Sequence, residues 1–167
     1  YLRDLVRDGY FGDILSTTLI GPGYSWAGST TLATAYLFDQ RNGATMLTIG
    51  FGHTVDALTW VLGEFDSLDA TFGYRRKTAR VIETGEIIPM TAPDQIVVGG
   101  TLKNGGVASL QYRAGIPRGT KMLWEICGTE GEMQLTSEVG HIGMGRLDIR
   151  TAHGEQNSLQ PLAIPEK

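Results

Sequence analysis

The chain has 167 residues, of which 41% are hydrophobic and 19% charged, with 14 Lys and Arg against 18 Asp and Glu. This composition is typical of a globular protein and excludes wholesale disorder. The net charge of −4 argues against direct binding of nucleic acid, which needs clustered cations, and the longest basic run is only Arg75-Arg76-Lys77. No apolar run reaches the roughly 18 residues that cross a bilayer. We therefore expect a cytoplasmic protein without a membrane partner.

The N-terminal segments predict a short helix, a strand and a loop. Residues 1–9 place apolar side chains at helical spacing and end at a glycine, whereas residues 13–20 are rich in β-branched side chains. A glycine-rich loop at 21–31 then holds two aromatic residues, Tyr24 and Trp26. These two rings would either stack on a ligand or cover a helix or a partner subunit, and the sequence leaves both roles open.

Residues 32–64 carry the only long helical pattern, in which apolar or small residues recur at steps of three and four up to a stop at Gly63. Trp60 follows this apolar spacing, and we expect it in the core. The histidine and aspartate of this helix, His53 and Asp56, are three residues apart and therefore lie on similar sides of it.

After Glu64 the pattern becomes that of strands. Asn104-Gly105 predicts a tight hairpin turn, and the alternation around Trp124 places that ring in the core. Since helices come first and antiparallel strands follow, we predict one α+β domain spanning 1–167, with helices on one face of a mostly antiparallel open sheet of about five to seven strands. The predicted strands are 68–76, 94–102, 106–114, 121–128, 132–137 and 147–152.

Several common catalytic and binding motifs are missing from the sequence. It has no G-x-G-x-x-G turn after a strand, no phosphate-binding P-loop and no G-x-S-x-G nucleophile motif. The three histidines, His53, His141 and His153, are too scattered for a metal site, and we expect no metal; the last two fall in polar connections and should be solvated. The single cysteine, Cys127, excludes an internal disulfide.

The segment around His53 is the most informative part of the sequence. Gly50 and Gly52 precede the histidine, and residues without a side chain let a ligand or another backbone approach closely. An imidazole can take or give a proton near neutral pH, so His53 is a candidate general acid or base. The spacing is also compatible with a partly buried structural histidine that has Asp56 as a local helix partner.

Residues 43–64 resemble the histidine helix of the Gfo/Idh/MocA oxidoreductase superfamily, with its His-x-x-Asp-x-x-x-Trp-x-x-Gly-Glu pattern. Three other segments, 6–16, 102–109 and 126–133, are similar to further turns of that superfamily in the same order. The run from Phe51 to Leu58 is most similar to its galactose-regulator-like branch. The resemblance implies a fold like the C-terminal domain of dihydrodipicolinate reductase, and a dinucleotide-binding Rossmann domain upstream of Tyr1.

The resemblance also implies roles for individual residues. His53 matches the catalytic histidine, while Tyr24, Trp26 and Asp56 become candidates for binding a sugar-like molecule. NAD or NADP would be held mainly by the upstream domain, and the cofactor-binding residues of this chain are not identified. Ile49 stands where the enzymes usually have an aspartate four residues before the histidine. Without that carboxylate, His53 lacks a group that would favour its charged form.

Three functions are therefore open. The first is the substrate and oligomerisation domain of an NAD(P)-dependent oxidoreductase that acts on a sugar or polyol. The second is a non-catalytic, dinucleotide-binding regulator similar to the galactose-pathway repressor. The third is a module for dimerisation alone. In each of them we expect a homo-oligomer formed through the sheet face that carries Gln111 and Arg113, because a sheet covered on one face leaves the other available.

Overall fold

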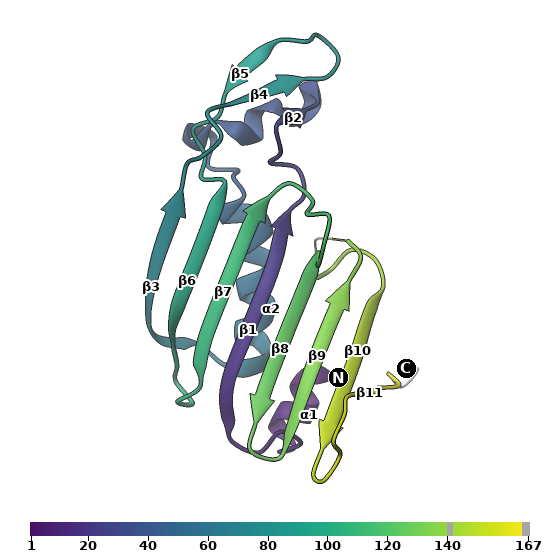
Figure 1. Ribbon diagram of the computed structural model, residues 1–167. Helices are drawn as coiled ribbons and strands as arrows, with labels where there is room; N and C mark the ends of the chain where they lie inside the picture. The colour runs from purple at the N-terminus through teal and green to yellow at the C-terminus, as the bar shows by residue number, and fades with distance from the viewer. Residues whose placement is uncertain (140–141, 165–167) are drawn as a thin grey trace.

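The computed structural model describes residues 1–139 and 142–164, and its main feature is an open sheet of eight strands (Figure 1). The strand order is β11-β10-β9-β8-β1-β7-β6-β3, and only the β1–β7 pair is parallel. The prediction of a mostly antiparallel sheet is confirmed, although the sheet is wider than expected. Its strands are β1 (Ile14–Gly23), β3 (Phe65–Gly73), β6 (Gln95–Leu102), β7 (Val107–Ala114), β8 (Met122–Gly128), β9 (Gly131–Ser137), β10 (Leu147–His153) and β11 (Gln160–Pro161).

A second, three-stranded sheet lies beyond one end of the large one and is drawn at the top of Figure 1. It consists of β2 (Ser29–Thr30), β4 (Thr78–Val81) and β5 (Ile87–Pro89). The sequence did not predict these strands, because none is longer than four residues and so none shows a readable alternation.

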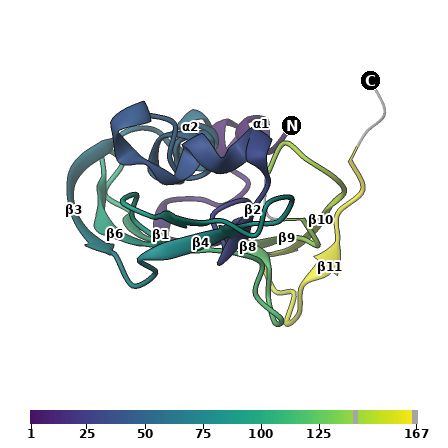
Figure 2. The same cartoon turned by 90° about the horizontal axis from the view of Figure 1, so that it is seen from above.

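The helices cover one face of the large sheet, as predicted, and Figure 2 shows the other face open. They are α1 (Leu2–Arg7), the π-helical turn η3 (Leu47–Phe51) and α2 (Gly52–Leu62), whereas the 3₁₀ turns η1 (Leu32–Phe38) and η2 (Gln40–Asn42) lie beside the small sheet, where η1 contacts β4 (Figure 1). The prediction of one helix over 32–64 is wrong in its first half. Gly43, in the left-handed conformation at φ 70°, ends η2. The Thr48 hydroxyl then accepts a hydrogen bond from the Thr45 backbone amide at 2.9 Å, where a new helix starts.

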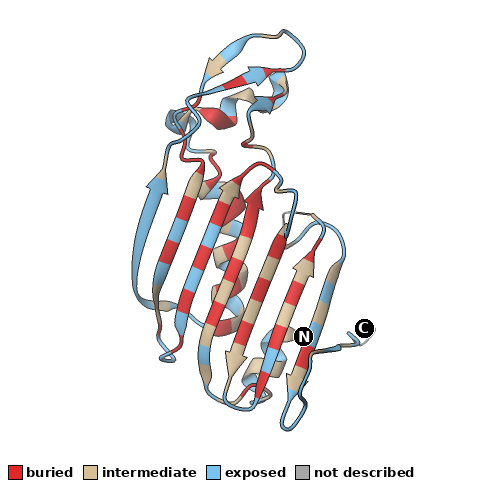
Figure 3. Cartoon of the chain, viewed as in Figure 1, coloured by how far each residue is buried: buried red, intermediate tan, exposed pale blue. Residues whose placement is uncertain are grey.

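The core lies between the helices and the sheet, and buried and less buried residues alternate along the central strands (Figure 3). Trp124 belongs to this core as predicted: it is 1% exposed, and its Nε1 donates to Thr17 Oγ1 at 2.9 Å. The same prediction is wrong for Trp60, which is 65% exposed. The buried side of α2 repeats every four residues, at Thr54, Leu58 and Leu62, and Trp60 falls between these positions. Its ring instead lies 3.8 Å from the guanidinium carbon of Arg3.

The connection between the two sheets is fixed by a buried carboxylate. Asp94 is fully buried, and its two oxygens accept the backbone amides of Arg75 and Arg76 at 2.7 and 2.9 Å. The Arg76 guanidinium approaches the same carboxylate at 3.6 Å. These contacts hold the segment that leaves β3 against the strand that begins at Gln95.

In the described part of the chain, no helix combines the length and the apolar character needed to cross a membrane.

Candidate functional site

A cavity of about 520 Å³ opens where β1 and β7 end beside the π-helical turn. Three of the four predicted site residues, Tyr24, Trp26 and His53, line it, and Asp56 does not. Apolar side chains form most of its wall. The described lining consists of Pro22, Tyr24, Ser25, Trp26, Ile49, Gly50, His53, Tyr112, Val139 and Met144.

The π-helical turn shapes the wall of this cavity at Gly50. The turn closes with the Phe51 amide donating to the Met46 carbonyl, five residues back, at 2.8 Å. It continues directly into α2, so that η3 and α2 together carry Ile49, Gly50 and His53. A Cβ at Gly50 would lie 3.2 Å from the Tyr112 ring, so a glycine here allows the helix to approach the sheet closely.

Tyr112 is a wall residue that the sequence analysis missed. Its side chain is buried on the helix side of β7, and its hydroxyl lies 3.3 Å from Thr54 Oγ1. Burial raises the pKa of Tyr112, and the contact with Thr54 offsets this only in part, so the phenol is neutral at physiological pH. The alternation of β7 predicted that residue 112 would face the core, but nothing local indicated that Gly21 and Gly50 would leave space for the ring.

The two aromatic residues of the loop occupy different environments. Trp26 is only 5% exposed, and its Nε1 donates to the Leu37 carbonyl at 3.0 Å, so this ring is a fixed part of the cavity wall. Tyr24 is 59% exposed and stands at the cavity mouth. Met144, on the opposite stretch of chain, is also exposed and lines the same cavity. The floor therefore contains a buried, hydrogen-bonded aromatic ring, whereas exposed side chains stand at the mouth.

His53 is exposed and lies in the first turn of α2, where it forms part of the cavity wall. Ile49 occupies the preceding turn and also lines the cavity, so the residue four positions before the histidine contributes an apolar surface. Asp56 is exposed, one turn further along α2, and its backbone carbonyl accepts the Thr59 hydroxyl at 3.1 Å. None of the described lining residues is a carboxylate.

His153 lies apart from this cavity. His153 ends β10, where its Nδ1 is 2.9 Å from the Tyr10 carbonyl and its ring stacks on Tyr10 with centroids 4.7 Å apart. It is exposed, as expected. His141 lies outside the described residues. Among the described residues, no group of three or more His, Cys, Asp or Glu side chains is arranged to hold a metal ion.

Comparison with known sequences identifies a family model and curated relatives that match this chain. Residues 1–137 match the family described as the Gal80p C-terminal domain. The galactose/lactose metabolism regulatory protein GAL80 of Saccharomyces cerevisiae is 29% identical over 95% of this chain and 41% of its own length. The chain thus spans about two fifths of that curated relative.

Solved structures share the fold. A super-repressor mutant of Gal80p from S. cerevisiae superposes with a TM-score of 0.87 at 23% identity, over 99% of this chain and 45% of that one. Levoglucosan dehydrogenase in complex with NADH and L-sorbose gives a TM-score of 0.79 at 19% identity, over 98% and 43%. The resemblance to the galactose-regulator-like branch of the Gfo/Idh/MocA superfamily is thereby confirmed, and the chain belongs to the family of the Gal80p C-terminal domain.

Proposed function

We propose that this chain is the ligand-binding half of a two-domain regulator that binds a dinucleotide without turning it over. The observation that carries the proposal is Ile49, which lines the cavity one turn before His53. An apolar residue at this position favours binding of an uncharged ring or sugar face, but it supplies no anion to stabilise a charged imidazole. The match to the Gal80p C-terminal domain over residues 1–137 supports the same function.

The residues of this chain fit only one end of a dinucleotide. Trp26 and Tyr112 provide an aromatic wall, and Gly50 allows close approach, which suits a flat ring or a sugar. The sequence has no glycine-rich strand–turn–helix for a pyrophosphate. An upstream Rossmann domain would hold the rest of NAD or NADP. When bound, the nicotinamide would supply hydride chemistry in an enzyme and only binding energy in a regulator.

The second candidate is an NAD(P)-dependent oxidoreductase that acts on a sugar or polyol. It is favoured by the position of His53, which lies in the cavity wall together with Tyr24 and Trp26. In that case the imidazole would exchange the hydroxyl proton of the substrate, and the aromatic residues would position the sugar. The structural relative that binds NADH and L-sorbose is a dehydrogenase, which supports this candidate.

Kinetics and binding on the full-length protein separate the two candidates. For a regulator we expect measurable dinucleotide affinity, no cofactor turnover on a panel of sugars and polyols, and a roughly tenfold weaker affinity in His53→Ala, about 1.4 kcal/mol. Asp56→Asn is the matched control, because it changes an exposed residue of the same helix outside the cavity wall. Turnover that falls by roughly 10²–10⁴-fold in His53→Ala would instead establish the enzyme.

The proposal includes self-association through the open face of the sheet. Gln111, Arg113 and the 55% exposed Val107 lie on this face of β7, and Val97 on the neighbouring strand β6 is 45% exposed there. Such a surface favours contact with a second copy of the chain over contact with water. Light scattering on the full-length protein should report a dimer or larger assembly, and a strict monomer would contradict this part of the proposal.

A further inference from the structure

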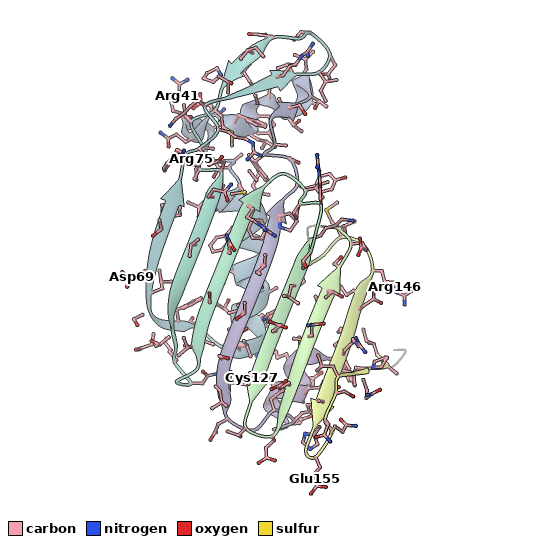
Figure 4. All side chains as sticks on the ribbon, in the orientation of Figure 1. Arg41, Asp69, Arg75, Cys127, Arg146 and Glu155 are labelled. Carbon is pink, nitrogen blue, oxygen red and sulfur yellow. The ribbon has the colours of Figure 1, made fainter. Side chains whose placement is uncertain are left out.

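A second cavity, of about 320 Å³, lies near the junction of the two sheets and is separate from the one that holds His53. The two cavities share no described lining residue. Two arginines, Arg76 and Arg113, line it from different segments of the chain. Figure 4 labels Arg75, the neighbour of Arg76, at this junction. The described lining consists of Ala27, Arg76, Gln95, Arg113, Ala114, Gly115, Ile116 and Pro117.

Arg113 lines this cavity with one long hydrogen bond to the protein and one buried donor that has no partner among the described residues. Its Nη2 donates to the Thr120 carbonyl at 3.3 Å, which is long for a hydrogen bond. Its Nε is buried and has no hydrogen-bond partner in the described part of the chain. A guanidinium has five N–H donors, and leaving a buried one unsatisfied is unfavourable. The described chain therefore gives the Arg113 guanidinium one long hydrogen bond, and its donors that face the cavity can take a further acceptor.

Arg76 is oriented by the buried carboxylate of Asp94 at 3.6 Å. That carboxylate already accepts the backbone amides of Arg75 and Arg76, and it is fully buried, so it lies behind the cavity wall and not among the lining residues. The Arg76 side chain itself is 41% exposed. No described lining residue is acidic, so the cavity presents two guanidinium groups and no carboxylate.

Gln95 adds an uncharged donor. It stands directly opposite Arg113 in the β6–β7 pairing, and it lines the cavity. Two guanidinium groups and an amide form a donor set that matches an oxyanion, because a guanidinium donates two parallel hydrogen bonds to a pair of oxygens. The Asp94 carboxylate offsets part of the charge of Arg76, so the attraction of the cavity for an anion comes mainly from Arg113.

We propose that this cavity binds the phosphate group of a small molecule, with Arg113 and Arg76 as its charged donors. The phosphate would accept hydrogen bonds from the guanidinium donors of Arg113 that face the cavity. The site is independent of the His53 cavity. It would let the protein bind a second small molecule, whether the full-length protein is a regulator or an enzyme.

The test uses the full-length protein and inorganic phosphate, with chloride at matched ionic strength as the reference. Calorimetry should detect phosphate binding, and phosphate at ten times its Kd should raise Tm by about 2–4 °C. In Arg113→Met the affinity should fall at least tenfold. Arg150→Met is the matched control, because it removes the same charge from an exposed position on β10, outside the cavity, and should bind phosphate like the wild type.

Stability without phosphate distinguishes a binding role from a structural one. Because Arg113 has a buried donor without a partner, Arg113→Met should leave Tm in chloride unchanged or raise it. If Arg113→Met instead lowers Tm equally in both buffers and the phosphate-dependent rise survives, the proposal is wrong. It is also wrong if the wild type shows no phosphate effect; dissociation of an oligomer by Arg113→Met would in that case assign the acceptor of Arg113 to a second copy.

Discussion

Gly21 determines how Tyr112 sits in the wall of the His53 cavity. The two residues are paired across β1 and β7, and a Cβ at Gly21 would overlap the Tyr112 ring. Gly50 meets the same ring from the helix side. The tyrosine therefore lies between two positions that have no side chain, and the shape of the cavity depends on both.

Gly21→Ala should lower the free energy of unfolding by roughly 1–3 kcal/mol, because the added methyl group has to displace a buried ring. Gly99→Ala is the control: Gly99 is a strand glycine with open space around its Cβ position, and alanine there should be neutral or stabilising by about 0.5–1 kcal/mol. Urea unfolding measures both. Equal changes in the free energy of unfolding for the two substitutions would show that the Tyr112 ring moves aside without an energetic cost.

The elements were predicted well where a strand is long enough to alternate and poorly where backbone geometry changes within a helix. The strand predicted at 106–114 is β7 within one residue, because four buried residues alternate with four less buried ones. The helix prediction at 32–64 missed the 3₁₀ turns and the π-helical turn, since apolar spacing is similar in all of them.

Local sequence patterns likewise predict only part of the candidate site. The neighbourhood of His53 was predicted from its glycine-rich helix and the family resemblance, and the structure places Tyr24 and Trp26 beside it. The contributions of Tyr112, Val139 and Met144 depend on strand order and on a distant loop, which no local pattern reports.

The stability of the segment that joins the two sheets can be tested by substituting Asp94. Asp94→Asn replaces a carboxylate that accepts two backbone amides by a group with one acceptor and one donor, so one amide loses its partner. We expect a loss of about 1.5–3 kcal/mol of unfolding free energy and faster hydrogen exchange at the amides of Arg75 and Arg76. Asp69→Asn, at an exposed position on β3 (Figure 4), should change stability by less than about 0.5 kcal/mol. Unchanged exchange at both amides in Asp94→Asn would contradict the assigned role.

The whole molecule combines a wide sheet, a helical cover on one face and a small sheet at one end, and this arrangement is shared with Gal80p and with levoglucosan dehydrogenase. The fold therefore does not separate a regulator from an enzyme, and the distinction depends on the residues of the cavity. We propose that the open face contacts a second copy of the chain, and that the cavity walls contact a ligand.

We predict that residues 1–167 alone bind neither NAD nor NADP with useful affinity, whereas the full-length protein binds one of them. The reason is that the chain contains no glycine-rich strand–turn–helix to hold a pyrophosphate. Titration calorimetry on the two proteins checks it, with circular dichroism to show that the shorter one is folded. Tight binding by residues 1–167 would overturn the two-domain assignment.

The central place of β1 also bears on how the chain reaches its native state. Ser16 pairs with Val107 on one side and with Cys127 on the other, so both neighbours of this early strand come from much later in the chain. Such non-local pairing gives a high contact order, and refolding should take milliseconds to seconds, not microseconds. During synthesis β1 would have two unpaired edges until residues 107–128 emerge, and an apolar strand in that condition is prone to misassembly and a natural substrate for chaperones.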